Sequence, residues 1–426
     1  MDLGITAALT ATVILVLLGV EILVCLGIGT ILLTVVTGQF TVENLGLTTF
    51  SALDNFPLLA MPLYILTGDL ISEGGISRLM VAFARAVVGW IRGGLALTAM
   101  LAAEGFAAIS GSNSATVAAI GRIMVPEMRK DGYPLDFAAG TIACCGTVGI
   151  VTPPSIVFVL YGVTAGVSVG DLFLGGILPG LVMIICMSVA AFALSIHYGY
   201  GGSVPFSVRT LLKAAWDAKL AFIATAIILG GIYGGIFTPT EAAAVAVAYC
   251  LLAGIAGTGQ LHVRQLPRVM EQSASITGLI APIIALAIVF SEVLAVLGLP
   301  QAGVKWLLSF SADPVVTMGM ILVILFIAGC VMDAIPNTLI LTPLLAPVAA
   351  GLGYHPVHFG VIMVVSLAIG FATPPFGLNL FVASSITGVP YLRIAVRAVP
   401  YVVALLVGLL IITAVPFLSL TFIPVR

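Results

Sequence analysis

The sequence predicts an all-α integral membrane protein with inverted repeats, two re-entrant helical hairpins and two helices broken by Thr-Pro-Pro. Three observations lead to this fold class: an apolar composition, a long internal repeat and one Thr-Pro-Pro break in each half. Of the 426 residues, 61% are hydrophobic and only 8% are charged. Soluble domains carry about 25% charged residues, so hydrocarbon is the expected solvent for this much apolar surface.

The composition also excludes several classes of function. A net charge of −2 without a basic cluster argues against nucleic-acid binding. The six cysteines lie in apolar surroundings without CxxC spacing, so they are expected to be small buried hydrophobes. No HExxH pattern is present, and the chain is not expected to be an enzyme or a channel.

The internal repeat appears when the chain is compared with itself at a shift of 221 residues. Identical residues at this shift are Pro126 and Pro347, Gly132 and Gly353, Tyr133 and Tyr354, Gly149 and Gly370, Pro179 and Pro400, with Thr-Pro-Pro at 152–154 and 373–375. An apolar composition alone would produce coincident Leu, Val or Ala residues but would not favour Gly, Pro and Tyr. The alternative to a true repeat is chance matching of these residues. Internal repeats of this kind are typical of secondary transporters.

The repeat divides the chain into three parts. Residues 1–210 form the first repeat, with scaffold helices, an arm near 76–90, a hairpin at about 94–128 and a broken helix at about 134–167. Residues 211–272 are inter-repeat helices and a linker. Residues 273–426 form the second repeat, with an arm near 301–310, a hairpin at about 314–350 and a broken helix at about 355–388. Trp90 beside Arg92, and Trp306 beside Lys305, favour arms at the membrane surface over ordinary connectors.

Each hairpin has two apolar limbs that are short for a full crossing and a small or polar tip, at 110–114 and 329–333. The turn after the first hairpin carries Arg129 and Lys130, whereas the matching turn at 351–354 carries no cation. The positive-inside rule therefore predicts that the hairpins enter from opposite sides. The same distribution suggests a cytoplasmic N-terminus and a periplasmic C-terminus.

The Thr-Pro-Pro breaks predict cation sites. Proline removes a donor and clashes with the carbonyl four residues earlier, so carbonyls at 149, 150, 370 and 371 are expected to lose their helical partners. Bare carbonyls are costly in hydrocarbon, and Thr152 and Thr373 add a hydroxyl at each break. Such oxygens suit Na⁺, and we expect at least two ions. The alternative is a pair of structural kinks with Thr bonded back to the helix.

The tip of the first hairpin is a candidate anion site, since a helix that begins there points free N–H groups inward. The candidate substrate-binding residues are Ser112, Asn113, Ser114 and Asn379. Among carboxylates in apolar stretches, Asp333 at the second tip is the strongest candidate for a cation ligand. For Asp69, Glu104, Glu241 and Glu292 the favoured interpretation is a hydrogen-bonded structural carboxylate near a helix end, and Glu21 has no assigned role.

Six stretches in this order resemble the large membrane subunit of the tripartite ATP-independent periplasmic (TRAP) transporters. They lie at 55–68, 110–119, 152–155, 235–242, 332–343 and 372–379, and include Ser110-Gly111-Ser112, Thr238-Pro239-Thr240-Glu241 and Ala372-Thr373-Pro374-Pro375. One departure is Asn113, where the family pattern has glycine.

The resemblance implies more than the residues do. It implies a multi-pass protein of the bacterial inner membrane that pairs with a small four-helix TRAP membrane subunit and a periplasmic substrate-binding protein. It implies Na⁺-driven symport of an organic acid, such as a C4-dicarboxylate or sialic acid, by an elevator-type transport domain that slides on a scaffold. Positions matching the family's sodium sites are Ser110, Ser112, Gly149, Thr152 and Pro154, then Gly329, Asp333, Gly370, Thr373 and Phe376. The alternative is a self-sufficient Na⁺- or H⁺-coupled anion transporter without a binding protein.

Overall fold

The computed structural model describes residues 3–38, 41–201, 205–310 and 313–423. Within these ranges the chain is helical, without a β-strand, which confirms the all-α prediction. Among the described residues, six helices are long and apolar enough to cross a membrane, or up to eight if each of two bent helix pairs is one span. The α-helices are α1 (Leu3–Leu17), α2 (Ile22–Thr37), α3 (Val42–Leu53), α4 (Ala60–Glu73), α5 (Ile76–Val88), α6 (Gly94–Ser110), α7 (Asn113–Lys130), α8 (Leu135–Cys145), α9 (Ile156–Ala165), α10 (Val169–Tyr198), α11 (Val208–Asp217), α12 (Lys219–Thr225), α13 (Gly231–Tyr233), α14 (Pro239–Leu252), α15 (Leu266–Val296), α16 (Leu299–Phe310), α17 (Pro314–Val331), α18 (Ala334–Gly351), α19 (Pro356–Gly370), α20 (Leu378–Thr387), α21 (Tyr391–Ala414) and α22 (Phe417–Leu420).

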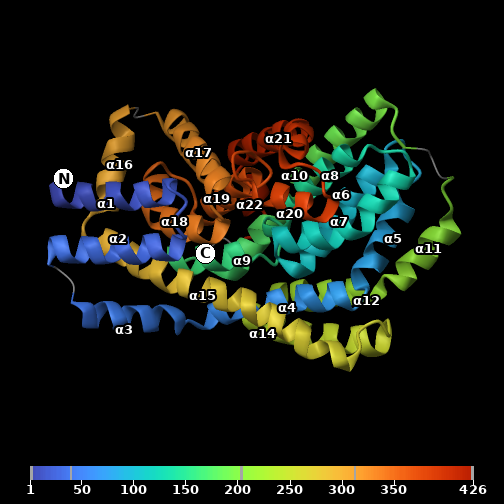
Figure 1. The fold of residues 1–426 in the computed structure, drawn as a ribbon, viewed down its shortest axis with the longest axis horizontal. Helices are drawn as coiled ribbons and strands as arrows, with labels where there is room; N and C mark the ends of the chain where they lie inside the picture. Colours follow the sequence, from blue (N-terminus) through green and yellow to red (C-terminus); the bar gives the residue numbers. More distant parts are fainter. Residues whose placement is uncertain (1–2, 39–40, 202–204, 311–312, 424–426) are drawn as a thin grey trace.

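Two groups of helices stand out in the fold (Figure 1). The first, which we call the outer layer, consists of α3, α4, α14 and α15, where α14 packs on α4 and α15 packs on both α3 and α4. The second, which we call the inner bundle, consists of α6–α10 and α17–α21. The two groups meet where α15 packs on α18 and where α4 packs on α6 and α9.

Two tight helical hairpins dominate the inner bundle, α6–α7 and α17–α18. In the first, Gly111 adopts a φ of +61° that ends α6, and Ser112 caps α7 by accepting a hydrogen bond from the Ala115 N–H. In the second, Asp333 caps α18 by accepting from the Ile335 N–H. Serine and aspartate are preferred caps because their oxygens satisfy N–H groups that have no helical partner.

The limbs of the two hairpins differ in whether they are long enough to cross a membrane. In the second hairpin, α17 and α18 each reach the length and hydropathy of a candidate span, so limb length alone does not separate a re-entrant hairpin from two crossings there. In the first hairpin α6 is a shorter apolar helix of 17 residues. Re-entry of the hairpins from opposite sides therefore stays a prediction.

The turn that follows each hairpin has the same backbone geometry in both halves. Gly132 and Gly353 have φ values of +86° and +87°, which favour glycine. The Tyr133 N–H donates to Met128 O at 3.0 Å, and the Tyr354 N–H donates to Ala349 O at 3.0 Å. Chance matching of Gly and Tyr does not explain a repeated turn, so the 221-residue shift reflects structure at this point.

The two halves also pack reciprocally. Each hairpin lies against the first arm of its own broken helix, α7 against α8 and α17 against α19. Each second arm lies against the hairpin of the other half, α20 against α7 and α9 against α18. This exchange makes the inner bundle one packing unit, as two halves related by a two-fold axis would require.

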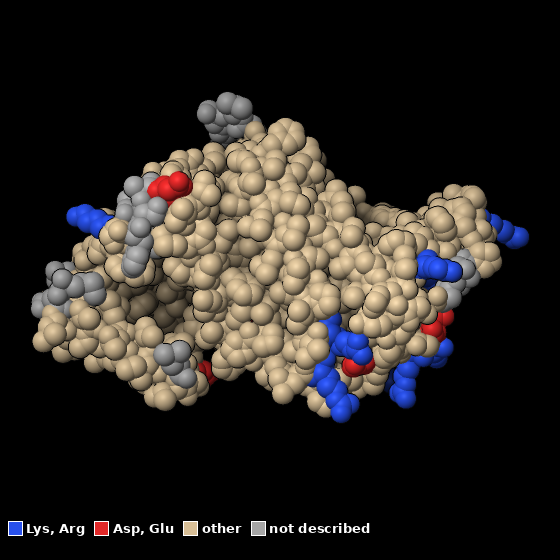
Figure 2. Space-filling model, turned by 90° about the horizontal axis from the view of Figure 1, so that it is seen from above, with Lys and Arg blue, Asp and Glu red and all other residues tan. Residues whose placement is uncertain are grey.

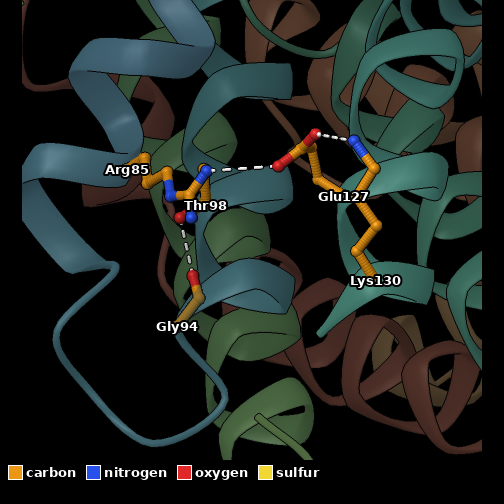
Figure 3. A network of polar contacts seen from close by, with 5 residues as sticks. All are labelled: Arg85, Gly94, Thr98, Glu127 and Lys130. Atoms are coloured by element: carbon orange, nitrogen blue, oxygen red, sulfur yellow. Dashed lines mark hydrogen bonds and ion pairs between the residues drawn. The ribbon is translucent and has the colours of Figure 1, made fainter. Parts of the chain in front are cut away.

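A polar network joins the α5 arm to the end of the first hairpin (Figure 3). Arg85 Nη1 lies 3.3 Å from Glu127 Oε2, and Lys130 Nζ lies 3.2 Å from Glu127 Oε1. Nearby, Thr98 Oγ1 donates to Gly94 O at 2.6 Å in the first turn of α6. Exposed ion pairs contribute about 0–1 kcal/mol, so this network orients α5 more than it stabilises the fold.

The basic side chains indicate an orientation. Those visible in Figure 2 gather mainly at one end of the molecule, the end that carries α5 and α11 in Figure 1. The positive-inside rule predicts that this end is cytoplasmic. Helix α1 starts at the opposite end (Figure 1). By the same rule the start of α1 is expected on the periplasmic side, opposite to the cytoplasmic N-terminus that the sequence alone suggested, and both assignments stay predictions.

Cysteine labelling tests this orientation. In a variant without the native cysteines, a membrane-impermeant maleimide added to spheroplasts is expected to label Leu3→Cys and Gly351→Cys but not Lys130→Cys. Detergent permeabilisation makes position 130 reactive and serves as the control. Labelling of position 130 from outside, or protection of position 3, would contradict the assignment.

Candidate functional site

The first hairpin tip and the first helix break are in backbone contact, and we call this contact the first junction. The break follows a 3₁₀ turn at Gly146–Ile150. A β-carbon added at Gly149 would lie 2.6 Å from Ser112 O and 2.7 Å from the Asn113 Cα. One added at Gly111 would lie 2.6 Å from Pro154 O. Glycine at both positions is therefore required for the tip to reach the break.

The second junction repeats this arrangement between the second tip and the second break. A β-carbon at Gly370 would lie 2.6 Å from the Cys330 N atom, and one at Gly329 would lie 2.8 Å from Leu367 O. The Phe376 N–H donates to Cys330 O at 3.2 Å, which ties the break to the tip. The structure thus brings Gly329, Gly370 and Phe376 of the second predicted cation set to one junction. It does the same for Ser112, Gly149 and Pro154 of the first.

The carbonyls expected to lose their partners at the breaks mostly have new ones. Ile150 O accepts from Ser155 Oγ at 2.5 Å. Gly370 O accepts from the Thr373 N–H at 2.9 Å, and Phe371 O accepts from the Asn379 N–H at 3.1 Å. The expectation of bare carbonyls is wrong for these three, because the chain after each proline pair turns back to donate to them. A carbonyl oxygen keeps a second lone pair, so a cation ligand role stays open.

The two threonine hydroxyls have different partners. Thr152 Oγ1 donates to Glu104 Oε1 at 3.0 Å, whereas Thr373 Oγ1 donates to Ile369 O at 2.9 Å. The second bond is the back-bonded form that a simple kink would show. In both cases the hydroxyl uses its hydrogen, and its oxygen lone pairs stay available to a cation.

The two junctions also differ in burial. Residues 152–154 are buried, whereas Pro374, Pro375 and Phe376 are exposed. A cavity of about 190 Å³ opens at the second junction, lined by Gly329, Asp333 and Phe376 among others. Asp333 is exposed there, with its Oδ1 3.0 Å from the Ile335 N–H that it caps.

The predicted substrate-binding residues lie together at the first junction. Ser112 Oγ and Ser114 Oγ are 3.5 Å apart. A β-carbon added at Gly146 would lie 2.7 Å from Asn379 Nδ2 and 3.1 Å from Asn113 O, so both asparagines border the same glycine. Asn379 comes from the second half of the chain and reaches this point through the packing of α20 on α7 and α8.

Several buried polar atoms in this region have no hydrogen-bond partner among the described residues. They are Ser110 Oγ, Asn113 Nδ2 and both amide atoms of Asn379. Asn379 is fully buried and Asn113 is 7% exposed. Buried polar groups are normally hydrogen-bonded, so these donors and acceptors fit a site that a polar ligand or ion completes.

Of the other candidate carboxylates, some have structural hydrogen bonds and the rest have no assigned role. Asp69 Oδ2 accepts from Ser273 Oγ at 2.6 Å, and Glu241 forms a capping box with Thr238 at the start of α14. Glu292 and Glu21 are exposed. The contact of Glu104 with Thr152 was missed by sequence reasoning, because nothing in the sequence relates an apolar limb to a break 48 residues later.

One match to a catalytic sequence pattern has a structural role here. The segment Gly166–Gly170 matches the GxSxG pattern of serine hydrolases, which requires a strand before the serine. Here Ser168 caps α10 by accepting from the Asp171 N–H, and no strand occurs in the described part of the chain. Within that same part, no group of three or more His, Cys, Asp or Glu side chains could hold a metal.

Discontinuous helices, hairpin tips that meet the breaks and unpartnered polar atoms at that meeting point define a membrane transporter of the broken-helix class. The comparison with known families identifies the particular transporter family. Residues 9–418 match the family described as "Tripartite ATP-independent periplasmic transporter, DctM component". The chain belongs to this family of large TRAP permeases, and as such it is a multi-pass protein of the inner membrane.

Relatives with assigned names agree over most of the chain. The C4-dicarboxylate large permease DctM of Pseudomonas aeruginosa is 40% identical over 380 residues, which cover 89% of each chain. The isethionate permease DctMQ of Oleidesulfovibrio alaskensis is 38% identical over 95% of this chain, which spans only 64% of that protein. The sialic acid large permease SiaM of Vibrio cholerae is 34% identical over 86% of both chains.

A solved structure supports the fold alone. The YdaH transporter of Alcanivorax borkumensis superposes with a TM-score of 0.58 at 13% identity, covering 86% of this chain and 88% of that one. The TRAP family and this fold match the class that the sequence predicts.

Alanine at the junction glycines tests the close approach. Gly149→Ala and Gly370→Ala are each expected to lower stability by about 1–3 kcal/mol, because the new methyl meets backbone atoms that cannot yield. The measurement is the thermal unfolding midpoint in detergent.

The matched control for these variants is Gly278→Ala in α15, where no heavy atom lies within 4 Å of an added β-carbon. This helical Gly→Ala change is expected to be neutral or to stabilise by about 0.5–1 kcal/mol. If the junction variants unfolded at the same temperature as the control, the tips would not depend on glycine.

Proposed function

We propose that this chain is the membrane permease of a Na⁺-coupled importer of an organic acid. A periplasmic binding protein delivers the acid, and a small four-helix membrane subunit completes the complex. The observation that carries this proposal is the pair of tip-and-break junctions, where buried polar groups converge without partners, in a chain of the TRAP permease family.

An acidic substrate is supported from two directions. Relatives are named for C4-dicarboxylates, isethionate and sialic acid, all of which carry an acid group. At the first junction, α7 begins at the tip, beside the hydroxyls of Ser112 and Ser114. A helix N-terminus and neutral hydroxyls attract an anion and still allow its release.

We propose at least two Na⁺ sites, one at each junction. The first uses oxygens of Ser110, Ser112, Gly149, Thr152 and Pro154, and the second uses those of Gly329, Asp333, Gly370, Thr373 and Phe376. Hydroxyl, carbonyl and carboxylate oxygens are ligands that suit a hard cation. Na⁺ also compensates the charge of the acid, which would otherwise enter a low-dielectric site uncompensated.

The arrangement of the helices fits an elevator mechanism. The inner bundle holds both junctions and is tied together by the reciprocal packing of α20 on α7 and α9 on α18. The outer layer of α3, α4, α14 and α15 lies along one side of it (Figure 1). We propose that the inner bundle moves as one body against the outer layer. We also propose that each hairpin tip closes only when the cation at its junction is bound.

Removing one ligand oxygen tests the Na⁺ sites. In proteoliposomes with the partner subunits, Thr152→Val, Thr373→Val and Asp333→Asn are each expected to raise the Na⁺ concentration for half-maximal uptake. Loss of one contact worth about 0.5–1.5 kcal/mol corresponds to roughly a two- to tenfold increase. Folding, followed by the thermal midpoint, is expected to change little.

The control is Thr225→Val in α12, whose hydroxyl bonds to Ala221 O four residues earlier, as that of Thr373 does to Ile369 O. Its Na⁺ dependence is expected to match that of the wild-type chain. An unchanged Na⁺ dependence in all three site variants, or uptake that is independent of Na⁺, would reduce the breaks to structural kinks.

Dependence on partners is tested separately. Cells that express this chain without the small membrane subunit and the binding protein are expected to show no uptake, and co-expression of both should restore it. Na⁺-driven uptake by the purified chain alone would instead support a self-sufficient anion transporter.

A further inference from the structure

Glu104 lies in the middle of α6, in the first hairpin, and its side chain reaches the first junction. Its Oε1 accepts the hydrogen bond from Thr152 Oγ1 at 3.0 Å. Its other oxygen, Oε2, is buried and has no hydrogen-bond partner among the described residues. Thr152, with which it pairs, is only 7% exposed.

This geometry leaves one carboxylate oxygen unsatisfied beside a threonine already assigned to a cation site. Leaving a buried carboxylate oxygen without a donor or a counter-charge is unfavourable. The Thr152 hydroxyl uses its only hydrogen on Oε1, so the lone pairs of Thr152 and the free Oε2 are both oxygen ligands without a partner. A small cation would satisfy both at once.

A neighbouring helix leaves space for the pair. Gly180 of α10 faces it, and a β-carbon added there would lie 2.8 Å from Thr152 Oγ1 and 3.6 Å from Glu104 Oε1. Any larger residue at this position would press on the threonine oxygen. The close passage of α10 thus holds Glu104 and Thr152 together without covering them with a side chain.

The two halves place their carboxylates differently. The residue 221 positions after Glu104 is Leu325, which is fully buried and apolar. The second junction has Asp333 instead, at the position that corresponds to Ser112 of the first tip. Each junction therefore has one carboxylate, supplied by a limb in the first half and by a tip in the second.

We infer that Glu104 is a direct ligand of the cation at the first junction and gives that site its fixed negative charge. The inference rests on the proposed Na⁺ coupling and adds to it a residue outside the expected ligand set. If Glu104 served only as the acceptor for Thr152, a neutral side chain of the same shape would replace it without loss.

Glu104→Gln separates these roles, because glutamine keeps an acceptor oxygen for Thr152 and removes the charge. The full-length chain, purified with its membrane partner, is titrated with NaCl at constant ionic strength using choline chloride. The thermal midpoint follows binding without transport. We expect a saturable Na⁺-dependent rise for the wild-type chain and a half-saturating concentration at least about tenfold higher for Glu104→Gln.

Two variants sharpen the comparison. Glu104→Asp keeps the charge and is expected to stay within about threefold of the wild-type value. Glu292→Gln is the matched control, since Glu292 is an exposed carboxylate of apolar α15, and it should leave the value unchanged.

Double variants assign the effect to a junction. Effects of residues that hold the same ion are not additive, so Glu104→Gln combined with Thr152→Val should shift the half-saturating concentration by less than the product of the single effects. Combined with Thr373→Val, at the other junction, the effects should multiply.

The possible results of the Na⁺ titration separate the role of Glu104 from Na⁺ coupling itself. A wild-type response to Na⁺ with an unchanged value in Glu104→Gln would overturn the inference and leave Na⁺ coupling intact. No response in the wild-type chain, together with Na⁺-independent uptake, would overturn the coupling itself. If Glu104→Gln does not fold, Gly180→Ala crowds the pair from outside and should raise the half-saturating concentration, and an unchanged value there would also overturn the inference.

Discussion

The central constraint on this molecule is that helices interrupted inside a membrane must still satisfy their backbone polar groups. Proline pairs at 153–154 and 374–375 break two helices, and nearby residues of the chain supply new hydrogen-bond donors. Ser155, Thr373 and Asn379 donate to the carbonyls that the breaks expose. The hairpin tips then pack directly on the breaks, which glycine at 149 and 370 makes possible. The positions of the hairpins, and therefore of the inner bundle, follow from these two contacts.

One sequence pattern produces two environments. The first junction is buried and combines Thr152 with Glu104 and with asparagines from both halves. The second is exposed, opens into a small cavity and has its threonine bonded back into its own helix. Thr-Pro-Pro sets the break in both cases, while the surrounding helices decide what the freed groups meet. Equivalent positions in the repeat are therefore not expected to have equal roles.

Reciprocal packing connects the junctions. Because α20 lies on α7 and α9 lies on α18, each half supplies part of the environment of the other. Asn379 is the clearest example, since it follows the second break yet borders Gly146 near the first. An ion or substrate at one junction is in this way linked to both halves, which suits a bundle that moves as one body.

The sequence by itself determined the membrane class, the two hairpins and the two breaks. These features depend on composition and on local rules, such as the proline clash and the positive φ of glycine at the turns. Only the tertiary structure decided the rest. It showed that three exposed carbonyls have donors, that α1 starts at the end opposite the basic side chains, and that Asn379 joins the first junction. It also paired Glu104 with Thr152. Apart from the carbonyl donors, which are local to each break, these relations join residues on different helices or at opposite ends of the molecule, and no local preference specifies them.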